Sequence, residues 1–218
     1  MSGEYRVYGA AGSGSVPVEA ALTLIGAPYS VVERATWKDP AEADAMAAVN
    51  PMRQVPALAL PSGELVTESA AILMWLAEAH PQARLAPAQA SPMRPRYLRW
   101  MSFISAQVYA LYWIRDDPSR LAVDPAHEPI VKARTAQRIA DCWKIMGEQL
   151  SPAGRFLLGD EPTVLDLYLT VVSRWGPRRK AFYAAAPDLA APVRAVDAEP
   201  RLAAFWAERF PFAEGWEG

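Results

Sequence analysis

A proline-rich segment near the middle of the chain most constrains how this sequence can fold. Residues 80–95, HPQARLAPAQASPMRP, hold four prolines, which interrupt helices and strands alike. Before it, strand-like and helical patterns alternate in the order strand, helix, strand, helix, strand, strand, helix. After it the patterns are helical, over 96–114, 129–150, 163–175 and 200–210. The sequence predicts a small α/β domain over 1–80, a linker over 81–95 and an all-helical domain over 96–218.

Composition excludes several classes of protein. The 218 residues are 52% hydrophobic and 21% charged, as in soluble globular proteins. A formal net charge of −2 shows no excess of the positive charge by which proteins bind nucleic acid. No apolar run reaches the ~18 residues of a membrane span, and the N-terminus lacks the apolar core of a signal peptide. One cysteine, Cys142, rules out an internal disulfide. We expect a cytoplasmic protein with Cys142 in its core, no metal site, and no nucleic-acid or membrane partner.

The segment YGAAGSGSVPVEAALTLIG, residues 8–26, has the layout of a nucleotide-binding loop. Gly12 and Gly14 fit the first two glycines of the dinucleotide fingerprint Gly-x-Gly-x-x-Gly, and Glu33 lies at nearly the distance that the fingerprint requires of its acidic residue. Pro17, however, replaces the third glycine, and a β-hairpin over 56–68 replaces the next βα unit. The Walker motif and the nucleophile elbow also fail, since neither Gly-Lys-Ser/Thr nor Gly-x-Ser-x-Gly is present. A dinucleotide-dependent oxidoreductase is therefore a distant alternative.

Ser13 and Ser15 stand at the start of the helix predicted after this loop. Unpaired N–H groups at a helix start bind anions, and serine hydroxyls add donors. The simpler alternative is that Ser15 only caps the helix and Ser13 only forms the turn. The stretch by itself favours that alternative.

Later segments change this balance. NPMRQVPAL (50–58), Ser62-Gly63-Glu64 and TESAAILMWLAEAHP (67–81) together resemble the N-terminal domain of cytosolic glutathione transferases, with a first loop like that of serine-type and bacterial members. FLLGDEPTVLDLYL (156–169) resembles the helix-capping signature of the family's second domain. The resemblance implies a thioredoxin-like domain with a mixed four-stranded sheet, then a helical bundle. It also implies that Thr163 and Asp166 form a capping box with a role in folding, not in chemistry.

The resemblance assigns a glutathione site residue by residue. Val55-Pro56 matches a valine followed by a cis-proline, whose backbone pairs with the cysteinyl part of glutathione like an added strand. Glu68 and Ser69 match the pair that holds the γ-glutamyl group: the carboxylate takes the ammonium, while Ser69 and the helix start take the α-carboxylate. Gln54 assists from the side. We also expect Trp37 and Lys38 to contact the glycyl end of glutathione. Arg53 reaches the glycyl carboxylate or lies on the surface, and both positions remain open.

The chemistry implied by the resemblance is activation of the glutathione thiol. Lowering a thiol pKa by ~2 units requires about 2.7 kcal/mol. A helix N-terminus supplies ~0.3–1 kcal/mol, and one hydrogen bond to a charged group adds roughly 1.5–3 kcal/mol. One well-aimed hydroxyl is therefore needed, and we expect Ser13 first and Ser15 second. Gly14 falls where some bacterial relatives carry a catalytic cysteine, which argues against chemistry through a protein thiol.

Aromatic residues of the first helix after the linker, Phe103, Tyr109, Tyr112 and Trp113, are candidates for the wall of an electrophile pocket, although core or dimer-interface positions are equally open. The basic residues Arg174, Arg178, Arg179 and Lys180 predict a solvated helix end, with acidic-substrate binding as the minority alternative.

The sequence thus predicts a glutathione transferase, a homodimer by the resemblance, that acts in detoxification on a small hydrophobic electrophile. Two alternatives remain open: a glutathione-dependent isomerase or reductase that uses the same thiolate, and a non-catalytic binding or regulatory protein of the same fold.

Overall fold

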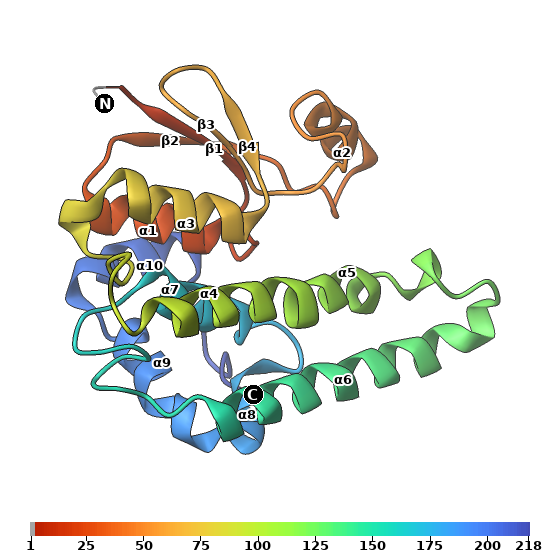
Figure 1. Ribbon diagram of the computed structural model, residues 1–218. Helices are drawn as coiled ribbons and strands as arrows, with labels where there is room; N and C mark the ends of the chain where they lie inside the picture. The colour runs from red at the N-terminus through yellow and green to blue at the C-terminus, as the bar shows by residue number, and fades with distance from the viewer. Residues whose placement is uncertain (1–2) are drawn as a thin grey trace.

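The computed structural model describes residues 3–218. Two layers lie one above the other: a sheet with its helices, and a larger assembly of helices only (Figure 1). The change in architecture follows α3, which ends at Ala79, as the proline-rich segment predicts. The thioredoxin-like sheet domain followed by an all-helical region is thereby confirmed.

The sheet has four strands in the order β2-β1-β3-β4. β1 (Tyr5–Gly9) pairs in parallel with β2 (Tyr29–Glu33), because α1 (Val16–Ile25) forms the crossover between them. β1 also pairs antiparallel with β3 (Ala57–Ala59), and β3 with β4 (Leu65–Thr67), as the predicted hairpin requires. The sheet is therefore mixed.

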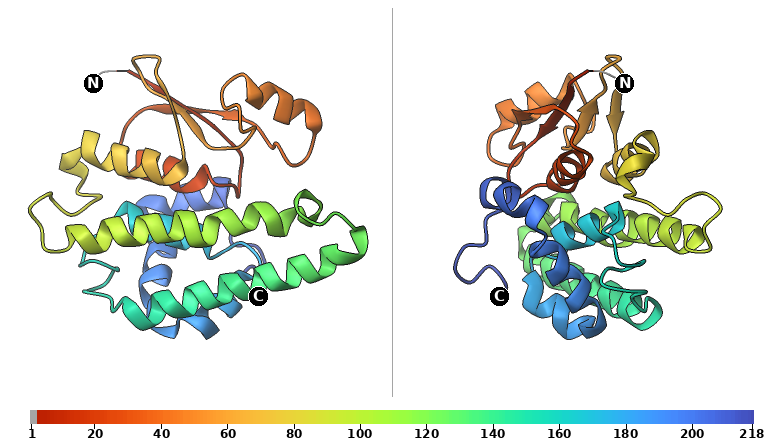
Figure 2. Two further views of the ribbon diagram at one scale, coloured as in Figure 1. Left: turned by 45° about the vertical axis from the view of Figure 1, so that its right-hand side comes forward. Right: turned by 90° about the vertical axis from the view of Figure 1, so that its left-hand side faces the viewer.

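Two helices lie between the sheet and the helical layer. α1 and α3 (Ser69–Ala79) pack against each other beneath the sheet, and both contact α7 of the helical layer (Figures 1 and 2). Several of their apolar residues, including Val18, Leu22 and Leu73, are fully buried. α2 (Pro40–Ala47) stands apart at the other side of the sheet, capped by Asp39, whose carboxylate accepts from the Ala41 N–H at 2.8 Å.

The helical layer is built around α7, whose residues are all buried. Its helices are α4 (Arg94–Phe103), α5 (Ala110–Asp116), α6 (Glu128–Gln149), α7 (Val164–Val172), α8 (Arg178–Ala185), α9 (Ala190–Asp197) and α10 (Ala203–Arg209). Short 3₁₀ turns cover Pro81–Ala83, Pro118–Arg120, Pro125–His127, Pro187–Leu189 and Pro200–Leu202. The line of α4 and α5 runs beside α6 as a long pair (Figure 2).

Three sequence expectations need correction. The helix predicted over 96–114 is not uniform, because a π-helical segment, Ile104–Tyr109, separates α4 from α5. The helices α8 and α9 were not predicted, since alanine and proline obscure their short apolar pattern. The basic cluster is only partly a solvated end: Arg174 and Arg179 are buried.

Local partners explain those buried arginines. Arg179 forms an ion pair with Asp197 at 2.7 Å and donates to the Thr170 carbonyl at 2.9 Å. Arg174 donates to the carbonyls of Phe210 and Pro211 at 2.8 and 2.9 Å. Burial lowers the pKa of Arg174 to about 10. Arg179 therefore joins α9 to α7, and Arg174 ties the residues after α10 to the helical core.

Other expectations are confirmed. Thr163 and Asp166 form the predicted capping box at the start of α7. Cys142 is fully buried in α6, as predicted. Within residues 3–218, no helix is both long and apolar enough to cross a membrane.

Candidate functional site

In the loop between β1 and α1, the serine hydroxyls point inward and form hydrogen bonds within the loop itself. Ser13 is 7% exposed and Ser15 is fully buried. The Ser13 hydroxyl accepts from the N–H groups of Ala10 and Ser15, both at 3.2 Å, and lies 3.0 Å from the Ser15 hydroxyl. Ser15 precedes α1 but makes no side-chain capping bond. Ser15 therefore stands at the N-cap position without capping the helix through its side chain.

A buried ion pair explains where Ser15 points. Its hydroxyl donates to Glu19 Oε1 at 2.6 Å, and Glu19 is fully buried one turn into α1. Arg209, at the end of α10, pairs with Glu19 at 2.5 Å and with Glu33 at 2.6 Å. Burial alone lowers the pKa of Arg209, but the hydrogen bonds and charges of Glu19 and Glu33 outweigh that effect and raise it. The first loop is thus fixed to the last helix.

Counting protons separates the two serines. A hydroxyl has one proton to donate. The proton of Ser15 goes to the Glu19 carboxylate, which can only accept while it is paired with Arg209. The proton of Ser13 faces only the Ser15 oxygen, at 3.0 Å. Ser13 is therefore the one serine of this loop that can turn its proton to a ligand without breaking the contact to Glu19.

The segment before β3 leaves a free stretch of backbone. The Val55-Pro56 peptide is cis, as predicted. Val55 is half-buried, and no backbone hydrogen bond joins it to another residue within 3–218. Asn50 holds the preceding turn, since its side-chain amide donates to the Gln54 carbonyl at 2.8 Å. Val55 can therefore accept an extended peptide as a short added strand.

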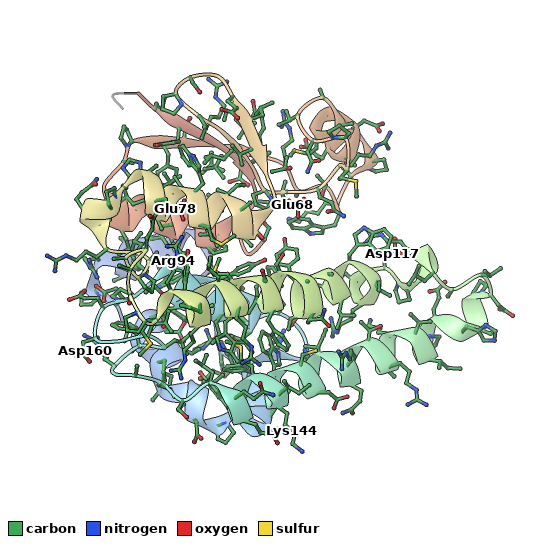
Figure 3. All side chains as sticks on the ribbon, in the orientation of Figure 1. Glu68, Glu78, Arg94, Asp117, Lys144 and Asp160 are labelled. Atoms are coloured by element: carbon green, nitrogen blue, oxygen red, sulfur yellow. The ribbon has the colours of Figure 1, made fainter. Side chains whose placement is uncertain are left out.

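The start of α3 combines strain with an open helix end. Glu68 is exposed and adopts φ 66°, a conformation that a residue with a side chain rarely takes. It makes no side-chain capping bond, so it does not close the helix start. Ser69 is buried, and its hydroxyl lies 2.9 Å from the hydroxyl of Tyr168 on α7. The label of Glu68 in Figure 3 marks where the sheet layer meets the helical layer.

Aromatic residues of the helical layer complete the site. The Trp175 indole donates to the Gly12 carbonyl at 2.8 Å, across the two layers. Tyr109 packs edge-on against Trp175, with ring centroids 5.1 Å apart, and lies 6.1 Å from Tyr168. Burial raises the pKa of Tyr168 to about 12, although hydrogen bonds from Ser69 and Ser105 oppose it. These phenols stay protonated at neutral pH.

The remaining predicted residues differ in exposure and in the contacts they make. Arg53 adopts φ 56° and forms an ion pair with Asp44 at 3.0 Å on the surface. Trp37 is exposed, as is Trp113 on α5. Phe103 packs against Trp100, with ring centroids 5.1 Å apart. Tyr112 is buried, and its hydroxyl donates to the Val172 carbonyl at 3.3 Å.

Sequence reasoning missed four residues of the site: Glu19, Tyr168, Trp175 and Arg209. One signal was available, because Glu19 interrupts an otherwise apolar stretch of α1 and a buried acid requires a cation. Its partner lies 190 positions away, and no local pattern reveals that distance.

Two hollows lie on the surface. One, of about 690 Å³, is lined mainly by residues of α6 and α8, including Lys144 and Asp141. Another, of about 400 Å³, lies between β2 and α10 and is lined in part by Glu33 and Arg209, which form the ion pair described above. Neither contains a predicted ligand residue. No group of three metal-ligating side chains occurs in the part of the chain that the structure describes.

Known proteins resemble this chain in both sequence and fold. A family model for the glutathione S-transferase N-terminal domain matches residues 12–79. The uncharacterized GST-like protein YncG of Escherichia coli (strain K12) is 31% identical over 198 residues, 90% of this chain and 94% of YncG. A glutathione transferase homolog from Sulfitobacter, solved with bound glutathione, has a TM-score of 0.80 at 24% identity and covers 93% of this chain and 96% of its own.

A sphingomonad glutathione S-transferase in complex with glutathione has a TM-score of 0.72 at 29% identity, over 91% of this chain and 96% of its own. The match to YncG extends through the sheet layer and the helical layer alike. Together with the two layers and the cis peptide before β3, this similarity shows that the chain belongs to the glutathione S-transferase family.

Proposed function

We propose that this protein is a glutathione transferase, which binds glutathione at the junction of its two layers and activates the thiol for attack on a small hydrophobic electrophile. The observation that carries the proposal is the free backbone at Val55, between the open start of α3 and the loop before α1. The similar Sulfitobacter and sphingomonad structures both hold glutathione, which supports the same ligand here.

Each part of glutathione has a matching group. The backbone of Val55, next to Pro56 and steadied through Gln54, pairs with the cysteinyl residue like an added strand. The exposed Glu68 carboxylate takes the γ-glutamyl ammonium. The N–H groups of the first turn of α3, which have no acceptor within the helix, take the α-carboxylate together with Ser69. Arg53 and Trp37, both exposed, remain our candidates for contact with the glycyl end.

The thiol lies at the start of α1. There it loses its proton to solvent, and the thiolate forms a C–S bond to the electrophile while the leaving group departs with the electron pair. The helix N-terminus contributes ~0.3–1 kcal/mol to this ionisation. Ser13 supplies a hydroxyl donor from the loop, ahead of Ser15, whose proton is held by Glu19. Phe103, Tyr109, Tyr112 and Trp113 remain our candidates for the apolar side of the electrophile.

The test is glutathione binding by calorimetry, followed by ultraviolet titration of the bound thiol. We expect wild type to bind glutathione and to hold the pKa of its thiol about 2 units below the free value. Ser13→Ala raises that pKa by about 1 unit, since one hydrogen bond to a charged group is worth roughly 1.5–3 kcal/mol. Ser102→Ala, at an exposed position on α4, is the matched control and changes nothing.

Two results separate the alternatives. Binding with an unshifted thiol in wild type favours the non-catalytic binding protein. A shifted thiol that turns over unsaturated substrates without a conjugated product favours the isomerase. The family also leads us to propose a homodimer in the cytoplasm, which sedimentation and fractionation would test.

A further inference from the structure

Gly14 lies unusually close to a side chain of the other layer. A Cβ built on Gly14 would lie 1.9 Å from the Tyr109 hydroxyl oxygen and 2.9 Å from the ring carbon that bears it. The first distance is far shorter than a non-bonded contact, so a side chain at position 14 would collide with the Tyr109 hydroxyl. The Tyr109 oxygen therefore lies against the Gly14 backbone, at the place where a side chain at position 14 would begin.

Several contacts hold Tyr109 in that position. The π-helical segment Ile104–Tyr109 ends at this residue, and such segments change which way the following side chains face. The ring packs against Trp175, whose indole is itself bonded to Gly12 in the same loop. Tyr168 covers another side of the ring, at 6.1 Å. The ring is thus clamped beside the start of α1 by residues of the helical layer.

The Tyr109 ring is fixed by packing, but its hydroxyl has no hydrogen-bond partner among the described residues. Among residues 3–218 it forms no hydrogen bond, whereas the Tyr112 hydroxyl donates to Val172 and that of Tyr168 lies against Ser69. It also differs from the Tyr97 oxygen, which is fully enclosed without a partner. A phenol fixed by packing, with its proton uncommitted and its oxygen at a helix N-terminus, is arranged to donate to an anion at that point.

We propose that Tyr109 is a catalytic residue of this site, whose hydroxyl donates a hydrogen bond to the sulfur of bound glutathione in place of the side chain that Gly14 lacks. This inference rests on the proposed function, since it requires glutathione to lie along Val55 with its sulfur at the start of α1. It adds a donor from the helical layer to the donor that Ser13 supplies from the loop.

The electrostatic surroundings agree with a donor role. Burial raises the pKa of Tyr109 well above its ordinary value, and the nearby Tyr168, Glu68 and Asp116 raise it further. The phenol therefore keeps its proton throughout the range in which a thiol ionises. It stabilises a thiolate by hydrogen bonding rather than by taking the thiol proton as a base.

The first test compares Tyr109→Phe with Tyr97→Phe. Each removes one hydroxyl from a half-buried or buried ring on the same line of helices, but Tyr97 lies on α4, away from the first loop. We expect Tyr109→Phe to retain glutathione binding within about threefold. We also expect it to raise the pKa of the bound thiol by about 1 unit and to lower kcat/KM about tenfold below that pKa. Tyr97→Phe leaves all three unchanged.

A second test moves the hydroxyl back to the loop. Tyr109→Ala alone removes the donor and opens space beside Gly14. Adding Gly14→Ser to Tyr109→Ala then supplies an oxygen beside the backbone of position 14, and we expect the bound-thiol pKa to return at least halfway to the wild-type value. If the double variant binds glutathione but the pKa of the bound thiol does not return, an oxygen beside the Gly14 backbone does not stabilise the thiolate, and the assignment of Tyr109 is overturned.

The two proposals fail differently. If wild type binds no glutathione, or binds it without a thiol shift, the proposed function fails and Tyr109 loses its role with it. If wild type binds and shifts the thiol while Tyr109→Phe shifts it equally, only the assignment of Tyr109 is overturned.

Discussion

The Asp166 carboxylate holds the start of α7 to the loop before it. It is 1% exposed and accepts hydrogen bonds from the N–H groups of Leu157 and Thr163, both at 2.8 Å, and from the Thr163 hydroxyl at 2.6 Å. Burial raises the pKa of Asp166, against the opposing effect of these donors. The residue thus satisfies three donors at the start of the most buried helix in the chain.

Asp166→Ala leaves those donors buried without an acceptor. We expect the free energy of unfolding to fall by about 3 kcal/mol or more, because each unsatisfied buried donor costs roughly 1–3 kcal/mol. The control is Asp39→Ala, which removes the exposed cap of α2 and costs about 1 kcal/mol. Urea unfolding measures both, and equal losses would refute the special role of Asp166.

The link between α1 and α10 depends on one buried charge pair. Glu19 is enclosed, so Arg209→Met leaves its charge without a partner. Breaking a buried pair in this way costs about 3–5 kcal/mol. Arg201→Met is the matched control, since Arg201 pairs with Glu199 but is half exposed, and such pairs contribute about 0–1 kcal/mol. Thermal or urea unfolding distinguishes the two variants.

A double variant checks the cause of that loss. Glu19→Gln combined with Arg209→Met removes both charges, and we expect it to recover more than half of the stability lost in Arg209→Met alone. No recovery would mean that the arginine acts through packing rather than through the charge of Glu19.

The elements of the chain were predictable to the extent that their signals are local. The strands, α1 with its terminal glycine at φ 74°, and the full span of α3 follow from periodicity and turn residues. The cis peptide and the capping box followed from motifs. The π-helical segment did not, because its sequence is an ordinary apolar helix pattern. The segment packs against α6 and α7, partners that its own sequence does not reveal.

Side-chain partners were less predictable than elements. The serines of the first loop were identified, but their orientation depends on Glu19 and Arg209, from opposite ends of the chain. The sequence predicted a solvated position for Arg179, because its partner, Asp197, lies on a helix that the sequence pattern did not reveal. A motif indicates which residues meet a ligand, whereas distant contacts decide which of their atoms remain free to do so.

Taken as a whole, the molecule builds its first loop from both layers. Gly12 donates its N–H to the Arg209 carbonyl at 2.9 Å and accepts from the Trp175 indole at 2.8 Å. Residues 1–80 alone would expose Glu19 and the apolar faces of α1 and α3. We therefore expect this fragment to show no cooperative unfolding and no glutathione binding by calorimetry. A folded, binding fragment would contradict the dependence of the loop on the helical layer.

The close approach of Gly14 and Tyr109 also bears on how this protein can evolve. A side chain gained at position 14 collides with the Tyr109 phenol. A smaller residue at position 109, with glycine still at 14, leaves the loop without a donor from either position. Each single step is unfavourable, whereas the paired exchange is sterically allowed. Positions 14 and 109, one in each layer, should therefore covary among related proteins. A lineage that replaces the donor at position 109 by a donor at position 14 through single substitutions passes through an intermediate that activates the thiol less well.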